Sequence, residues 1–173
     1  MTQLLSKLKT MKLGIIIICH NIENDIDIRS CIKYLNNLKD IEVCLVNNNS
    51  KDKTYTALKM IKEGCIHVSI VNIKKLKSDS SAVKAGARFM SNKFNISNLG
   101  FVNSTAVKEY ESLSVLIRTI DDSQIDISIF KNELSNKKEI KRTLFQSLFS
   151  VMDFLTKINS KKDHKSLNRL GKY

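Results

Sequence analysis

The sequence predicts an α/β fold, a single domain with a mainly parallel central sheet flanked by helices. Short runs rich in β-branched apolar residues alternate with longer stretches of helical period, which is the order of strand–helix–strand crossover units. Several runs are apolar almost throughout, as in strands covered on both faces. A chain of 173 residues, 42% of them hydrophobic, suits one domain with its own core.

The elements follow in order along the chain. The predicted strands are residues 13–19, 41–46, 66–72, 99–103 and 125–130, and the predicted helices are residues 26–37, 51–63, 81–93, 111–120 and 138–158. Ser50 is suited to cap the second helix and Gly64 to end it. In the third helix, a face of small residues is predicted to pack closely on the sheet: Ala82, Ala85, Gly86 and Phe89. We expect residues 159–173 to be loosely ordered.

The net charge of +12 is concentrated near the C-terminus, where residues 131–173 hold 11 Lys and Arg against 4 Asp and Glu. A basic tail can meet nucleic acid, anionic lipid or a phosphorylated substrate, and a solvated basic face is the plain alternative. Nucleic acid ranks last, because the chain has 6% aromatic residues and no RNA-stacking motif.

The four cysteines, Cys19, Cys31, Cys44 and Cys65, follow no metal-ligand spacing. Cys19 and Cys44 lie in or beside apolar runs, so we expect reduced core thiols in a cytoplasmic protein. Lysines precede residues 13–19, but this run is short and lacks a small-residue cleavage site. We therefore expect a first strand there and no signal peptide. No stretch is long and apolar enough to span a bilayer.

The predicted last helix carries a broad apolar stripe framed by basic residues. The stripe holds Leu144, Leu148, Met152 and Leu155, and the basic frame holds Lys141, Arg142 and Lys157. Three interpretations stay open: packing on its own sheet, peripheral contact with an anionic membrane, and a dimer seam.

Several common chemistries lack their motifs. With five glycines the chain has no GxGxxG turn and no GxxxxGK[ST] loop, so classical NAD-binding and P-loop functions are disfavoured. It has no GxSxG elbow either. The histidines His20, His67 and His164 are far apart and not near a Cys or carboxylate in metal spacing, which argues against zinc.

Ligands of open α/β sheets bind at the carboxyl ends of the strands. Three polar, amide-rich segments follow predicted strands: residues 20–21 (HN), 47–50 (NNNS) and 103–105 (NST). They can donate and accept hydrogen bonds but carry little negative charge. The plain alternative is that asparagine is a good turn residue.

Three motifs carry a resemblance to a known family. Residues 13–26 (LGIIIICHNIENDI) resemble the opening strand and P-x-Y-N-E-E-x-x-I turn of family 2 glycosyltransferases. Residues 41–54 (IEVCLVNNNSKDKT) resemble that family's E-I-I-V-V-D-D-G-S-T-D-G-T, and residues 80–86 (SSAVKAG) its K-x-A-A-L-x-A-G helix start. The three occur in order at the expected spacing and cover residues 13–105.

The resemblance implies a GT-A-type fold that binds a nucleotide-diphosphate sugar, with UDP- or GDP-sugar as the donor and an unknown acceptor. Residues 13–105 would form the nucleotide-sugar-binding half and residues 106–158 the acceptor-side half. Asn47 takes the place of an acidic residue that accepts a hydrogen bond from the base, and an amide oxygen can accept from a uracil N–H. The implied nucleotide-binding residues are His20, Asn21, Asn47, Asn48, Ser50, Lys77, Lys84 and Asn103.

The resemblance also bears on metal binding and activity. Family members end the fourth strand with a DxD motif that holds Mg²⁺ or Mn²⁺, whereas the matching Asn103-Ser104-Thr105 has no carboxylate. Lysines between the third strand and third helix are the candidates for neutralising the diphosphate instead: Lys74, Lys75, Lys77 and Lys84. We expect either sugar transfer without the usual metal or a non-catalytic homologue that binds nucleotide or a partner. No catalytic base is assigned.

Overall fold

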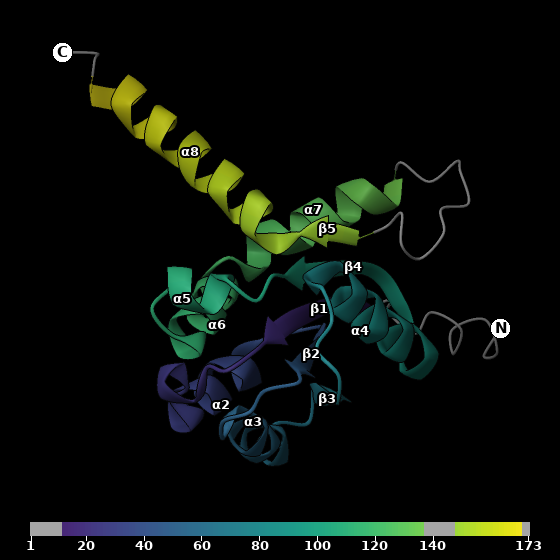
Figure 1. Ribbon diagram of the computed structural model, residues 1–173. Helices are drawn as coiled ribbons and strands as arrows, with labels where there is room; N and C mark the ends of the chain where they lie inside the picture. The colour runs from purple at the N-terminus through teal and green to yellow at the C-terminus, as the bar shows by residue number, and fades with distance from the viewer. Residues whose placement is uncertain (1–11, 137–147, 171–173) are drawn as a thin grey trace, which may run out of the picture.

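The computed structural model describes residues 12–136 and 148–170 (Figure 1). At its centre is an all-parallel five-stranded sheet of order β3-β2-β1-β4-β5, which confirms the predicted fold class. The strands are β1 (Lys12–Cys19), β2 (Ile41–Asn48), β3 (Val68–Ile73), β4 (Ile96–Val102) and β5 (Leu148–Ser150). The helices are η1 (Glu23–Asp25), α2 (Ile28–Asn37), α3 (Thr54–Glu63), α4 (Asp79–Lys93), α5 (Ala106–Glu109), α6 (Leu113–Asp122), α7 (Gln124–Asn136) and α8 (Val151–Leu170).

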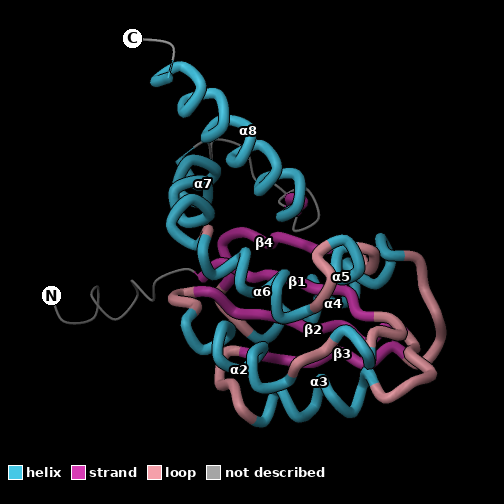
Figure 2. The backbone as a smooth tube through the Cα atoms, turned by 90° about the vertical axis from the view of Figure 1, so that its left-hand side faces the viewer, coloured by secondary structure: helices cyan, strands magenta, loops and turns pink. Residues whose placement is uncertain are grey.

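Helices cover both faces of the sheet, as the apolar runs predict. Alternate side chains of β1 enter two separate clusters: Ile15 and Ile17 pack with the residues of α2, α3 and α6, and Ile16 and Ile18 pack with those of α4. Figure 2 shows the strands enclosed between these helices. All of these isoleucines are at most 1% exposed, so the burial of β1 on both faces supplies much of the hydrophobic stabilisation.

The predicted strand at residues 125–130 is wrong, because these residues lie inside α7. The sequence IDISIF alternates like a strand, but burial follows a helix: Ile127 is fully buried, while Ile125 and Ile129 are 73% and 53% exposed. The helix begins with a bond from the Ile127 N–H to the Ser123 carbonyl at 3.0 Å. Period-2 patterning over six residues cannot exclude a short helix when the polar residues between the isoleucines are also exposed.

The fifth strand lies at residues 148–150 instead, where the sequence predicts the middle of a long helix. It pairs with β4 through Gly100, which lies opposite Phe149. A Cβ atom at Gly100 would lie 2.7 Å from the Val151 side chain and 2.9 Å from Phe149, so the glycine permits the close approach of this segment. The first part of the predicted helix, residues 138–147, lies outside the described residues.

Local predictions around α3 and α4 have mixed outcomes. Ser50 does not cap α3, which begins at Thr54, whereas Gly64 ends it as predicted. The small-residue face of α4 is confirmed at Ala82, which is fully buried, and at Gly86. A Cβ atom at Gly86 would lie 2.8 Å from the Ile16 side chain, so α4 and β1 approach closely.

The last helix, α8, leaves the sheet and extends outward (Figure 1). Leu155 of the predicted apolar stripe is buried, which confirms that part of the stripe as core, and Val151 in the same first turns is buried as well. The helix continues to Leu170, so residues 159–170 are helical where we expected loose order. Among the described residues, no helix has the length and hydropathy to cross a membrane.

All four cysteines are buried and free of disulfides, as predicted. Burial raises the pKa of the Cys31 and Cys44 thiols to about 12, which leaves them protonated at neutral pH. These thiols therefore act as small core residues.

Candidate functional site

The carboxyl ends of the parallel strands meet along one edge of the sheet, and we call the loops there the mouth. It comprises residues 20–27 after β1, the last two residues of β2, 47–48, with residues 49–53 after them, residues 74–78 after β3 and residues 103–105 after β4. The connections from β1 and β2 step in one direction along the sheet, while the connection from β3 crosses back to β4 on the other side of β1. Such a reversal places a crevice between β1 and β4.

Side chains tie the β1 and β2 loops together. The Asn21 N–H donates to Ser50 Oγ at 3.1 Å, and the Lys51 N–H donates to Asn21 Oδ1 at 2.8 Å. Beneath them, the Ile22 N–H donates to Thr54 Oγ1 at 2.8 Å. Asn21 has a φ of 48°, in the left-handed region that asparagine tolerates better than most residues. Asn21 and Ser50 therefore fix the shape of the loop. This hydrogen bond gives the Ser50 hydroxyl a structural role other than the predicted helix cap.

The His20 ring is held through both nitrogens. Nδ1 lies 2.8 Å from the Asn48 carbonyl oxygen, which can only accept, so Nδ1 carries the proton. In the neutral ring Nε2 then accepts from Asn21 Nδ2 at 3.2 Å. The ring is half-buried at the tip of β1. Because both nitrogens have partners, the ring offers a ligand its face.

Asn48 fixes the loop that carries the lysines. Its Nδ2 donates to the Lys77 carbonyl at 2.8 Å, and its Oδ1 accepts from the Lys77 N–H at 3.0 Å. Asn48 is 2% exposed, whereas Lys74, Lys75 and Lys77 are exposed. One buried amide thus holds the backbone of Lys77 while leaving the lysine side chains at the surface.

Asn47 is the unusual residue of the mouth. Its Nδ2 donates to Asn72 Oδ1 at 2.8 Å across the β2–β3 pair. Its Oδ1 is buried and, among the described residues, is the one buried side-chain nitrogen or oxygen without a hydrogen-bond partner. A buried acceptor without a donor costs about 1–3 kcal/mol. This atom is therefore poised to accept a hydrogen bond from a group that enters the mouth.

A carboxylate from another segment lies at the tip of β4. Both the N–H and the hydroxyl of Ser104 donate to Asp79 Oδ2, at 2.9 and 3.0 Å, and Asp79 is the first residue of α4. Asn103 beside it is exposed. No group of three His, Cys, Asp or Glu side chains suited to a metal occurs within residues 12–136 and 148–170. One half-buried carboxylate among neutral oxygens does not fit a protein-held Mg²⁺ or Mn²⁺ site.

Two other carboxylates of the mouth are occupied by backbone amides. Asp52 accepts from the Thr54 N–H at 3.0 Å and the Glu23 N–H at 3.1 Å, and Glu23 accepts from the Lys53 N–H at 2.7 Å. Burial raises the pKa of Asp52, but hydrogen bonds from Thr54 and Glu23 outweigh it and hold the pKa below its ordinary value. Asp52 therefore stabilises the loops in its charged form, and Glu23 adds a hydrogen bond to the Lys53 backbone.

The structure gathers most of the predicted site residues at the mouth: His20, Asn21, Asn47, Asn48, Ser50, Lys77 and Asn103. Lys84 lies apart, exposed in the second turn of α4. Sequence reasoning missed Asn72 and Asp79. Asn72 had a signal, because it is the last residue of a predicted strand, just as Asn47 directly follows one. Asp79 had none, since it lies 25 residues before the Ser104 that it contacts.

Known proteins show similarity to this chain. A family model described as Glycosyl transferase family 2 matches residues 14–172. Among solved structures, the chain is similar to the crystal structure of residues 1–349 of S. aureus TarS, with 15% identity and a TM-score of 0.42. The similarity covers 66% of this chain and 33% of that one, so this chain spans about a third of that structure. A search of curated proteins found no match.

Proposed function

Because the chain belongs to glycosyl transferase family 2, we propose that it binds a nucleotide-diphosphate sugar at the mouth and transfers the sugar to an acceptor. The observation that carries this proposal is the buried Asn47 Oδ1 without a donor. A ligand N–H that reaches this atom makes a hydrogen bond and removes a cost already present in the folded protein.

The chemistry of Asn47 selects among bases. Uracil N3–H and guanine N1–H can donate to Asn47 Oδ1 from the ring, whereas the corresponding ring nitrogens of cytosine and adenine are acceptors and these two bases can donate only from their exocyclic amino groups. Because Asn47 Oδ1 is buried, the proposal requires the exposed Asn72 side chain to turn aside and admit the base. The face of the His20 ring offers the base a flat surface at the tip of β1. UDP- and GDP-sugars are therefore the proposed donors.

The lysine loop suits the diphosphate. Asn48 holds the Lys77 backbone, and Lys74 and Lys75 add positive charge in the same loop. Charge builds on the diphosphate as the sugar leaves, so lysines near it stabilise the transition state more than the ground state. Asn103 supplies an amide at the β4 tip that can bind the sugar or a phosphate oxygen. Lys84 joins this set only if the diphosphate extends along α4.

A second function is a binder without sugar transfer, in which nucleotide or a partner occupies the mouth. The lack of carboxylates at Asn103-Ser104-Thr105 favours it, as does the engagement of Asp79 by Ser104. Loss of metal ligands removes the usual means of stabilising the leaving diphosphate.

Nucleotide binding tests the proposal, and turnover separates the two functions. We would measure the affinity of UDP, GDP, CDP and ADP by calorimetry, with and without Mn²⁺. UDP or GDP should bind at least about 10-fold more tightly than CDP and ADP, because cytosine and adenine present an acceptor at the ring position where uracil and guanine present an N–H to Asn47. Equal affinity for all four, or no binding, would overturn the proposal. Transfer from a panel of UDP- and GDP-sugars would then identify an enzyme, and binding without transfer the second function.

Lysine variants test the diphosphate site. Lys77→Ala should weaken UDP binding several-fold while leaving uridine binding unchanged, since only the diphosphate meets the lysine. Lys62→Ala is the matched control, because Lys62 is an exposed lysine in the last turn of α3, at the other end of that helix from the mouth. If both variants bind UDP equally, the lysine loop does not hold the diphosphate.

A further inference from the structure

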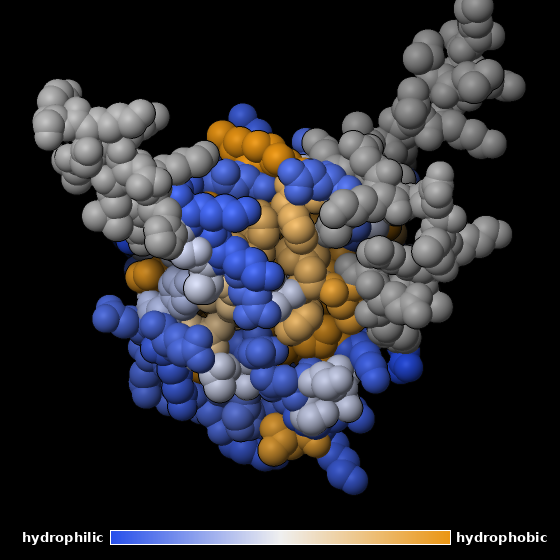
Figure 3. Space-filling view, turned by 90° about the horizontal axis from the view of Figure 1, so that it is seen from above, coloured by the Kyte–Doolittle hydropathy of each residue, from blue (hydrophilic) through white to orange (hydrophobic). Residues whose placement is uncertain are grey.

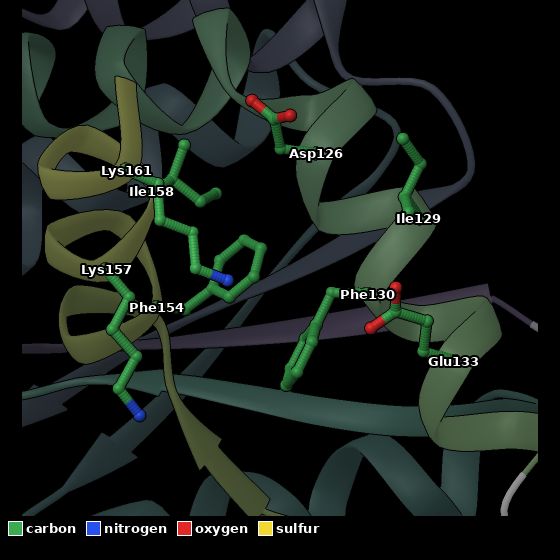
Figure 4. Close-up of a pocket in the computed structure, with 8 residues that line it drawn as sticks. All are labelled: Asp126, Ile129, Phe130, Glu133, Phe154, Lys157, Ile158 and Lys161. Carbon is green, nitrogen blue, oxygen red and sulfur yellow. The ribbon is translucent and has the colours of Figure 1, made fainter. Parts of the chain in front are cut away.

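A groove runs between α7 and α8, remote in sequence from the mouth loops. It encloses about 270 Å³, and its lining includes Ile129 and Phe130 from α7 and Phe154 and Ile158 from α8 (Figure 4). Phe130 and Phe154 stack with their ring centres 4.5 Å apart, and Phe149 packs edge-on against Phe130 at 5.3 Å. The stacked rings of Phe130 and Phe154 thus line the groove with apolar surface, and Phe149 supports Phe130 from outside the lining.

The two walls of this groove carry opposite charges. The α7 wall carries Asp126 and Glu133, and the α8 wall carries Lys157 and Lys161 (Figure 4). Lys162 of α8 reaches across to Asp126 at 3.2 Å, so the walls already attract each other within one chain.

An apolar ridge on α7 borders the groove. Ile125 and Ile129, one helical turn apart, are 73% and 53% exposed. Ile125 and Ile129 also border a second groove of about 450 Å³, whose charged lining is three carboxylates, Asp40, Asp121 and Asp122, and one lysine, Lys39, so that it is acidic on balance. Four features therefore follow one another across this surface: the acidic groove, the apolar ridge of α7, the apolar groove between α7 and α8, and the basic wall of α8. Figure 3 shows apolar residues exposed beside hydrophilic ones at this end of the molecule.

We propose that this surface binds a second copy of the chain, with the α7 ridge of each copy seated in the α7–α8 groove of the other. A two-fold interface brings one patch against itself, so it requires a patch that is self-complementary in shape and charge. Here the ridge fits the groove, as helix ridges do when they pack. The acidic side of one copy also faces the basic α8 of its partner, in both halves of the interface.

The outer part of α8 also favours a second copy of the chain as the partner of this surface. From Thr156 to Lys162 the residues of the helix are half-buried or exposed, and the helix extends away from the sheet (Figure 1). Most helices in proteins depend on tertiary packing for their stability. A second copy would supply that packing.

The charge pattern favours a protein partner over an anionic membrane. Carboxylates at Asp122 and Glu133 border the apolar ridge and groove, whereas Asp126 is already paired with Lys162 of its own chain. A membrane of anionic lipid would repel these groups, whereas the lysines of a second copy would pair with them.

Light scattering coupled to size exclusion tests the proposal on the full chain. The wild-type protein should be a dimer at micromolar concentration, and Ile129→Lys should be a monomer with an unchanged circular dichroism spectrum. Ile66→Lys is the matched control: Ile66 is 89% exposed, lies next to β3 at the opposite edge of the sheet, and should leave the dimer intact. A monomeric wild type, or an Ile129→Lys dimer, would overturn the proposal.

Charge reversal tests the two-fold arrangement. Asp122→Lys with Glu133→Lys replaces two negative charges by two positive ones on the acidic side, and Lys157→Glu with Lys161→Glu does the reverse on the basic side, so each double variant alone should dimerise more weakly than the wild type. Mixed together they should form a heterodimer in preference to either homodimer, because in both halves each new charge then faces groups of the opposite sign. Failure to form it refutes the two-fold arrangement. Binding of the wild-type monomer to phosphatidylserine vesicles, lost in Lys157→Glu with Lys161→Glu, would instead identify a membrane surface.

Discussion

Replacing Asn47 with leucine should make the protein more stable and its nucleotide binding weaker. The substitution removes the buried Oδ1, which costs about 1–3 kcal/mol without a donor, and forfeits one bond to Asn72, which contributes about 0.5–1.5 kcal/mol. Asn72 is exposed and can hydrogen-bond water afterwards. The balance is a gain of about 1 kcal/mol, which raises Tm by about 2–4 °C in a protein of this size.

The same substitution should weaken UDP binding at least about 10-fold, because a methyl group then faces the N–H of the base. Calorimetric melting and UDP titration measure the two effects on one sample. Asn98→Leu is the control: Asn98 is also buried, 4% exposed, but lies early in β4 and donates to Ser97 Oγ. It should lose stability and keep UDP affinity. A lower Tm for Asn47→Leu, or unchanged UDP affinity, would refute the reasoning.

Three further predictions concern the mouth. Asn48→Ala should lower stability by about 1–3 kcal/mol in urea unfolding, since both of its bonds to Lys77 are lost, and unaltered stability would contradict the clamp. Asp52→Asn should cost about 1 kcal/mol at pH 7, and because the folded-state pKa of Asp52 is depressed, the difference from wild type should vanish as pH falls below 3.8. A difference that persists at lower pH would show that charge is not the cause. Asn103→Asp with Thr105→Asp should make UDP binding respond to Mn²⁺; no response would mean that the β4 tip is not where the family holds its metal.

The central sheet could be predicted from the sequence because each of its first four strands is an apolar run with helical residues on either side. Burial on both faces leaves such a run little alternative. The prediction of the C-terminal part was wrong for a physical reason. Its fifth strand, Leu148–Ser150, has three residues, and its place is set by the room that Gly100 leaves on β4. That contact joins segments far apart in the chain, and no local pattern reports it.

The mouth could be predicted in outline because strand order follows from crossover connections and strand ends from the sequence. The partners within it could not. Asn72 and Asp79 matter through contacts with Asn47 and Ser104 that depend on the sheet register and on where α4 begins. The single-residue choice of Ser50 as a cap also failed, because its hydroxyl accepts from Asn21 rather than from the start of α3.

The amides of the mouth divide into two kinds according to what the fold already uses. In Asn21 and Asn48 both the side-chain oxygen and the side-chain nitrogen form hydrogen bonds with loop backbone or with His20. Substituting either residue should therefore disturb the structure first. In Asn47 only the side-chain nitrogen forms a hydrogen bond, and the side chain of Asn103 is exposed. A folded protein gains nothing from a buried acceptor without a donor, so selection for folding alone does not explain Asn47. The ligand recognition that we propose would explain it whether or not the sugar is transferred. Nucleotide binding is required by the first proposed function and allowed by the second, so Asn47 is the residue through which the first can be refuted.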